Sequence, residues 1–306
     1  EMSRSSSLWV AVPGLQPRSA RGPARVVLGV APGTVECQWR GDLFSRSSSS
    51  RTPAAGRQEA TLGRVRWSSG QAAQGDLQGF HWKMQEEFAE CQSPEEVFQL
   101  LRKYEGKVPI APPAANSAAY GLAKANKRGK PERRVTDAVR RLANMVMDRE
   151  EEASSRNFVQ VLWSSATVRV RDPGLWDRAA KVLVRRTPTL EPRALSEACW
   201  ACANAGVQDA ELGEALSHQF AVTIDTANEQ DVAMASFGLA TMGVMTPAAA
   251  EAMSGYIARH VDTAKPKELA ACLWALAKCN SPSGPWEAVV HRTAREVDRF
   301  GARGVA

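Results

Sequence analysis

Four aromatic residues recur along the second half of this chain at a constant spacing. Trp163, Trp200, Phe237 and Trp274 lie 37 residues apart, and each begins a similar pentapeptide, WSSAT, WACAN, FGLAT and WALAK. A fifth copy, YGLAK at Tyr120, precedes Trp163 by 43 residues, which an insertion into the 37-residue period explains. A constant period of this length is typical of supersecondary units that stack on one another.

The residues around each anchor predict that a unit consists of two helices. The first residue after the anchor is always small and the third is always Ala, which lets neighbouring helices approach closely. Sixteen and 20 residues after the anchor come residues that share a helix face because they are four apart: Ala179 and Leu183, Leu216 and Phe220, Met253 and Ile257, Val290 and Ala294. One such hairpin cannot bury its own apolar surface, so the units must stack.

We therefore predict an all-α fold, a right-handed α-solenoid of about five 37-residue helical hairpins within residues 76–306. The expected units are 111–152, 153–189, 190–226, 227–263 and 264–300. Upstream, Ser93-Pro94-Glu95-Glu96 has the pattern of a helix start, in which Ser caps, Pro takes the first turn and Glu96 completes a capping box. We expect that helix to run from Glu95 to about Tyr104.

Residues 1–75 have a different composition and are expected to be disordered. They contain ten Arg, no Lys, four acidic residues and twelve Ser, so they hold the whole net charge of +6, and residues 76–306 are neutral. An Arg-rich, Ser-rich and acid-poor leader is typical of an organellar transit peptide. Arg66-Trp67-Ser68-Ser69 resembles a mitochondrial processing site. We expect targeting to the mitochondrion, with the plastid as the alternative; a basic tail with another role also fits this composition.

The aromatic-small-x-Ala pattern at a period of 37 resembles the heptatricopeptide repeats, which are relatives of the octotricopeptide repeats of algal organelles. The resemblance covers roughly residues 115–300, and no segment resembles the RAP domain in which some members end. It implies an organellar α-solenoid that binds single-stranded RNA and acts in RNA processing, stability or translation, or as a part of the organelle's ribosome. The neutral repeat region favours an alternative, a protein–protein scaffold that does not contact RNA.

Two groups of residues are candidates for RNA contact. The first is a polar stripe on the first helix of each unit, because a polar side chain at a constant offset is the geometry of a base-per-repeat reader: Arg156, Gln160, Thr167, Arg171, Arg193, Asn204, Gln208, Gln230, Thr241, Lys267 and Lys278. The second is a basic cluster suited to phosphate contact: Lys124, Lys127, Arg128, Lys130, Arg133 and Arg134. Alternatively, the stripe is an ordinary solvated face, and Glu150-Glu151-Glu152 pairs with the cluster.

The sequence gives little support to catalytic or metal chemistry. Cys199-x-x-Cys202 aligns with Leu or Ser in the other units, which favours packing over metal binding, and no second CxxC completes a zinc site. The four His are isolated, and no run of about 20 apolar residues could span a membrane. We therefore expect no enzyme activity, no metal or other cofactor, no small-molecule substrate and no membrane partner.

Overall fold

The computed structural model describes residues 69–105, 109–126, 131–281 and 284–295, all within one compact unit, Cys37–Val305. The other unit, Glu1–Glu36 with Ala306, lies outside these ranges, as does most of the predicted leader 1–75. The described residues form α-helices joined by short turns and contain no strand, which confirms the predicted all-α fold.

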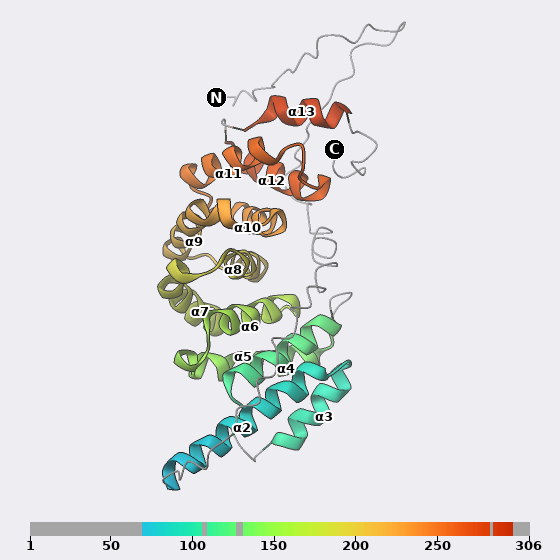
Figure 1. Cartoon of the computed structure of the whole chain (residues 1–306), viewed down its shortest axis with the longest axis vertical. Coiled ribbons are helices and arrows are strands. Elements are labelled where there is room, and N and C mark those ends of the chain that lie inside the picture. The colour runs from blue at the N-terminus through green and yellow to red at the C-terminus, as the bar shows by residue number, and fades with distance from the viewer. Residues whose placement is uncertain (1–68, 106–108, 127–130, 282–283, 296–306) are drawn as a thin grey trace, which may run out of the picture. The chain divides into compact units, whose positions relative to one another are not determined.

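The helices lie in two layers that follow the chain (Figure 1). The inner layer contains α2 (Ser69–Glu90), α4 (Pro112–Ala125), α6 (Ser155–Thr167), α8 (Pro192–Ala205), α10 (Glu229–Met242) and α12 (Pro266–Lys278). The outer layer contains α3 (Pro94–Tyr104), α5 (Arg133–Asp148), α7 (Pro173–Arg186), α9 (Ala210–Thr223), α11 (Pro247–His260) and α13 (Trp286–Arg295). Each inner helix packs against the next inner helix along the chain, as a helical-repeat arrangement requires.

Local sequence explains where these helices begin and end. Asp172 and Asp209 cap α7 and α9, each accepting a hydrogen bond from the backbone N–H three residues on, at 3.2 and 2.9 Å. Gly206 and Gly243 end α8 and α10 with φ of 76° and 73°, a left-handed conformation that glycine adopts without strain. The predicted capping box is confirmed at α3, where Ser93 Oγ accepts from the N–H of Glu96 at 3.3 Å.

The anchor aromatics hold successive inner helices in the same register. The ring centroids of Tyr120 and Trp163 are 5.7 Å apart, those of Trp163 and Trp200 6.0 Å, and those of Phe237 and Trp274 5.1 Å. These distances are typical of favourable aromatic pairs. The equivalent positions of successive repeats therefore meet in the structure, as their spacing predicts.

The outer helices follow the predicted register except at α13. The paired positions in α7, α9 and α11 are all buried, but Val290 is 41% exposed and Ala294 is also exposed, whereas Val289 and Arg292 are buried. This last pair shares a helix face, as its spacing predicts, but the face is exposed, unlike those of the other three pairs. Pro285 lies eleven residues after its anchor whereas Pro173 and Pro247 lie ten after theirs, so the loop before α13 breaks the spacing that aligns the other outer helices.

The helix α2 was not expected from the sequence. It begins at Ser69, ahead of the expected start of the helical region at residue 76. Met84 and Phe88 of α2 are buried in the common core, and Glu87 accepts hydrogen bonds from Lys103 and Tyr104 of α3 at 2.5 and 2.7 Å. With α3 it adds a helical pair before the first predicted unit.

Candidate nucleic-acid interface

The predicted polar stripe on the inner helices is not one continuous exposed surface. On a helical wheel, the small residue after the anchor lies between these polar positions, and it is buried in the last four units: Ser164, Ala201, Gly238 and Ala275. Helical periodicity places these residues on the polar side of their own helix, but packing against a neighbouring inner helix buries them, as Gly238 of α10 against Cys199 of α8 shows. The interpretation of the whole stripe as an exposed reading face is therefore wrong, and the exposed residues lie at its two ends.

Towards the N-terminal ends of the inner helices, several stripe residues bond to other protein groups. Gln160 accepts a hydrogen bond from Asn116 of the preceding inner helix at 2.7 Å. Arg193 lies 3.3 Å from Glu197, and burial raises the pKa of the Glu197 carboxyl above its usual value. Lys267 lies 3.5 Å from the buried carboxylate of Glu268. Gln230 is half-buried, and Arg156 is exposed and interacts electrostatically with Glu197.

The position four residues after the anchor varies between units. Asn204 is buried and donates to the carbonyl of Trp200 at 2.8 Å, and Thr167 donates to the carbonyl of Trp163 at 2.8 Å. Lys124, Thr241 and Lys278, in contrast, are exposed. Since Asn204 and Thr167 bond to their own helices, the arrangement does not present one equivalent polar side chain per repeat.

Exposed cations do gather where the inner helices end. We call this surface, formed by the C-terminal ends of the inner helices and the loops that follow, the basic edge; its exposed polar residues are Lys124, Arg169, Arg171, Gln208, Thr241 and Lys278. In the described parts of the loops after α6, α8, α10 and α12, the only carboxylates are those of Asp172 and Asp209, which cap helices. With Glu132 in the loop after α4, the described carboxylates of the basic edge are fewer than its four cations, so the edge has an excess of positive charge.

Two arginines in the loop after α6 contribute to the basic edge. Arg171 donates to the backbone carbonyls of Asn204 and Ala205 at 3.3 and 3.1 Å, so its guanidinium bridges two units without meeting a carboxylate. Arg169, with φ of 59°, is exposed beside it. Arg169 was not among the predicted residues, although its position two residues before Arg171 is a signal that could have identified it.

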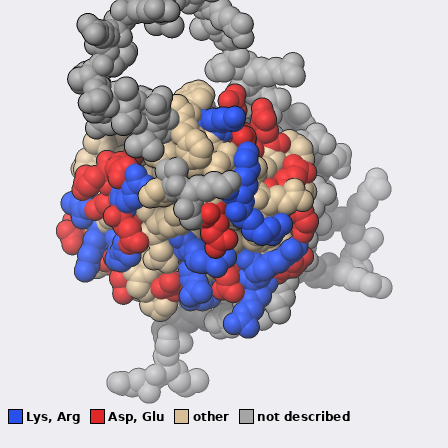
Figure 2. Space-filling model, turned by 90° about the horizontal axis from the view of Figure 1, so that it is seen from below, with Lys and Arg blue, Asp and Glu red and all other residues tan. Residues whose placement is uncertain are grey.

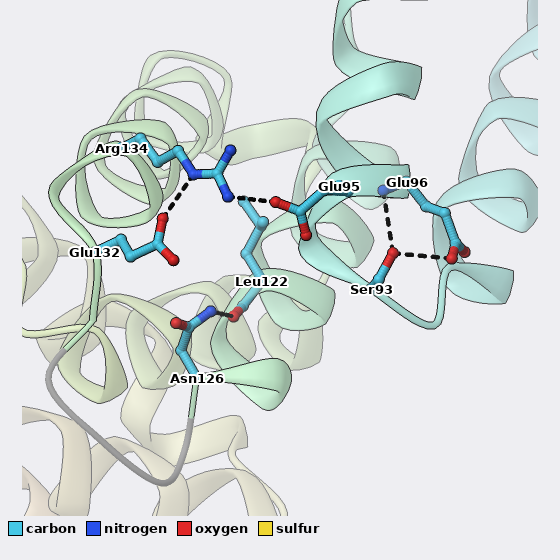
Figure 3. A network of polar contacts seen from close by, with 7 residues as sticks. All are labelled: Ser93, Glu95, Glu96, Leu122, Asn126, Glu132 and Arg134. Atoms are coloured by element: carbon cyan, nitrogen blue, oxygen red, sulfur yellow. Dashed lines mark hydrogen bonds and ion pairs between the residues drawn. The ribbon is translucent and has the colours of Figure 1, made fainter.

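The predicted basic cluster is partly neutralised by nearby carboxylates. Arg134 donates to Glu132 at 2.7 Å and to Glu95 of α3 (Figure 3). Arg133 and Arg140 share the carboxylate of Asp137, at 3.7 and 3.3 Å. Lys127, Arg128 and Lys130 lie outside the described residues. Of the cluster residues predicted to bind RNA, only Lys124 is described and has no partner in the described ranges.

The acidic run after α5 does not neutralise this cluster. Glu150 accepts from Arg185 at 2.6 Å, and Glu152 accepts from Arg149 at 2.7 Å. The suggestion that Glu150-Glu151-Glu152 pairs with the cluster is therefore wrong for these two residues. Their partners instead lie in the outer layer, where Arg178 and Asp148 form a similar pair at 2.7 Å.

The cysteines are packing residues. Cys199 and Cys202 are buried, and burial raises the pKa of the Cys202 thiol to about 12 and that of Cys199 well above its usual value. Within the described ranges, no group of three His, Cys, Asp or Glu side chains could hold a metal ion. No helix in those ranges has the length and apolar character needed to cross a bilayer.

One further face of the molecule has mixed charge. Lys and Arg are interspersed with Asp and Glu on the face shown in Figure 2, so no large area of it is of one charge.

Neither a family model nor a curated protein matches the sequence. The function must therefore be inferred from the surfaces themselves.

Proposed function

We propose that this chain is an organellar RNA-binding helical-repeat protein that acts in RNA processing, stability or translation, including as a component associated with the organelle's ribosome. Its repeats form a right-handed solenoid of about five 37-residue units, and residues 1–75 direct it to the mitochondrion, with the plastid as the alternative. The observation that carries the RNA proposal is the basic edge, where the C-terminal ends of α4 and α12 and the loop after α6 expose Lys124, Lys278, Arg169 and Arg171.

The basic edge suits the backbone of a single strand better than it suits individual bases. Packed helices lie about 8–10 Å apart, so the cations at the ends of the neighbouring helices α4 and α6 are close enough for one extended strand to contact both. Because Asn204 and Thr167 bond to their own helices, the described residues offer few groups to read base edges. We therefore expect binding dominated by phosphate contacts and weakly dependent on sequence.

The test measures the anisotropy of a labelled single-stranded oligonucleotide at several salt concentrations. Replacing Lys124, Arg169 and Lys278 with Ala should lower the affinity and reduce the slope of log affinity against log salt by about 0.7 for each phosphate that is no longer neutralised. A control replaces Lys83 and Lys181, which are exposed on α2 and α7 and lie outside the basic edge. The proposal fails if binding ignores salt, or if the control variant loses as much affinity as the edge variant.

A protein–protein scaffold built on the same stack is the alternative. Two observations favour it: residues 76–306 carry no net charge, and charges of both signs are mixed on the surface in Figure 2. Mixed charges set the specificity of protein interfaces without attracting polyanions. A folded protein that binds no single-stranded RNA, even at low salt, would support this alternative.

A further inference from the structure

The outer layer opens between its first two helices. α5 packs against α7, α7 against α9, and α9 against α11, whereas α3 and α5 do not pack together in this way. In place of that contact is a groove of about 680 Å³. A helical-repeat layer normally buries the apolar side of each helix against its neighbour, so this opening leaves apolar surface of α3 and α5 uncovered.

The walls of this groove, which we call the α3–α5 groove, are mainly apolar. They are formed by Phe98, Leu101, Ile110, Ala138, Leu142 and Met145. Arg134 links the two helices beside the groove, since its guanidinium reaches Glu95 on α3 (Figure 3). The same guanidinium lies 5.0 Å from the centre of the Phe98 ring, which lines the groove.

Charged side chains stand at its rim. Arg102 of α3 and Arg141 of α5 line the groove, are exposed, and pair with no carboxylate in the described parts of the chain. Glu105 is the one carboxylate that lines it. The neighbouring Arg133, Arg134 and Arg140 all have carboxylate partners. The apolar floor therefore lies between two guanidinium groups that lack a counter-charge.

We propose that the α3–α5 groove binds an amphipathic helix of a partner protein, with apolar side chains on one face and carboxylates beside that face. The apolar side chains enter between α3 and α5, where an outer-layer neighbour would pack, and the carboxylates meet Arg102 and Arg141. Helix-in-groove recognition uses this combination of apolar anchors and flanking charge. The proposal is independent of RNA binding at the basic edge.

The lining favours a peptide over a nucleobase. The guanidinium of Arg134 lies over the Phe98 ring, and the hydroxyl of Tyr104 donates to Glu87 at 2.7 Å, so both aromatic residues are engaged. The remaining walls are aliphatic, and the polar side chains of the lining are the charged ones at the rim, Arg102, Arg141 and Glu105. Single-strand sites, in contrast, depend on aromatic faces on which bases stack.

The test uses two helix-forming peptides with leucines at intervals of three and four residues, one flanked by glutamates and one by lysines, and measures their binding to the full chain by calorimetry. Wild type should bind the glutamate peptide and discriminate against the lysine peptide. Arg102→Glu combined with Arg141→Glu should lower the affinity for the glutamate peptide by about tenfold or more and allow the lysine peptide to bind. Leu101 and Met145 are half-buried, and replacing both with Ala should lower the affinity for both peptides.

Lys83→Glu combined with Lys181→Glu is the matched control, because it removes two exposed cations that do not line the groove. It should leave both affinities unchanged, and circular dichroism should show every variant folded. The proposal is overturned if folded wild type binds neither peptide saturably, or if the arginine reversal leaves the preference for glutamate intact. Displacement of the bound peptide by a single-stranded RNA oligonucleotide at Arg102 and Arg141 would also overturn it, because the groove would then be a nucleic-acid site.

Discussion

Gly238 shows how a missing side chain permits two inner helices to pack. A Cβ atom at this position would lie 2.6 Å from both the carbonyl carbon and the carbonyl oxygen of Cys199 on α8. Both are backbone atoms, so α8 and α10 would have to separate. We predict that Gly238→Ala lowers the free energy of unfolding by about 1–3 kcal/mol, because overpacking outweighs the better helix propensity of Ala. Urea denaturation monitored by circular dichroism measures this change.

Gly255 supplies the control for that prediction. It lies in the interior of α11, where an added Cβ would meet only the end of the Arg259 side chain at 3.4 Å. Ala should therefore stabilise the chain at this position, by up to about 1 kcal/mol, through helix propensity alone. If Gly238→Ala were also neutral or stabilising, the close approach of α8 and α10 would not be a constraint on the packing.

The buried thiols should be unreactive in the folded chain. Burial raises the pKa of Cys202 and of Cys272 to about 12, so at pH 8 nearly all of each thiol is protonated and shielded. Cys91 is half-buried and should react faster with iodoacetamide than either of them. Peptide mapping by mass spectrometry after brief labelling checks this, with urea-unfolded protein as the reference. Equal labelling of Cys91 and Cys202 before unfolding would contradict the packing role.

At the scale of single elements, α3 depends on Arg134 for its position relative to α5. The pairs of Arg134 with Glu95 and Glu132 are exposed, and exposed ion pairs contribute little to global stability. We expect Arg134→Ala to leave the melting temperature nearly unchanged but to increase amide hydrogen exchange in α3. Arg133→Ala is the control, since it removes only a long contact with Asp137 within α5. Unchanged exchange in α3 would show that its contacts with α2 and α4 suffice to hold it.

Several elements could be predicted from the sequence because their determinants are local or repeated. The start of α3 followed from the Ser93 capping box, and the register of the inner helices followed from the 37-residue spacing of the anchors. The register of α13 could not be predicted in the same way, because its loop departs from the repeat. The α2 helix lies before the repeats, so no repeated position marked its buried residues.

The candidate site was less predictable than the fold because exposure depends on neighbouring helices. A helical wheel places Ser164 on a polar face, but only the packing of neighbouring helices shows that this position is buried. Similarly, Asn204 is polar and aligned with Lys124 and Lys278, yet its amide bonds to its own helix. The α3–α5 groove depends on the separation of two helices, which no spacing in the sequence encodes.

At the scale of the whole molecule, stability should propagate only between neighbouring units. Each inner helix contacts the inner helices before and after it, and repeat arrays of this kind behave as a sum of units and interfaces. Leu239 and Leu276 occupy the same position in α10 and α12, and both are fully buried. Replacing either with Ala removes the same buried side chain and should destabilise its surroundings by about 2–5 kcal/mol.

The two substitutions leave cavities at different places along the stack, and this place should determine which helices lose protection from exchange. Leu276→Ala should increase amide hydrogen exchange in α12 and α13 while α6 stays protected, because α6 does not pack against α12. Leu239→Ala should increase exchange in α8, α10 and α12, because α10 packs against both neighbours. Hydrogen exchange with mass spectrometry resolves these segments. An equal rise in exchange across α6, α8, α10 and α12 for both variants would mean that the chain unfolds as a single cooperative unit, in which case the repeats do not act as separable modules.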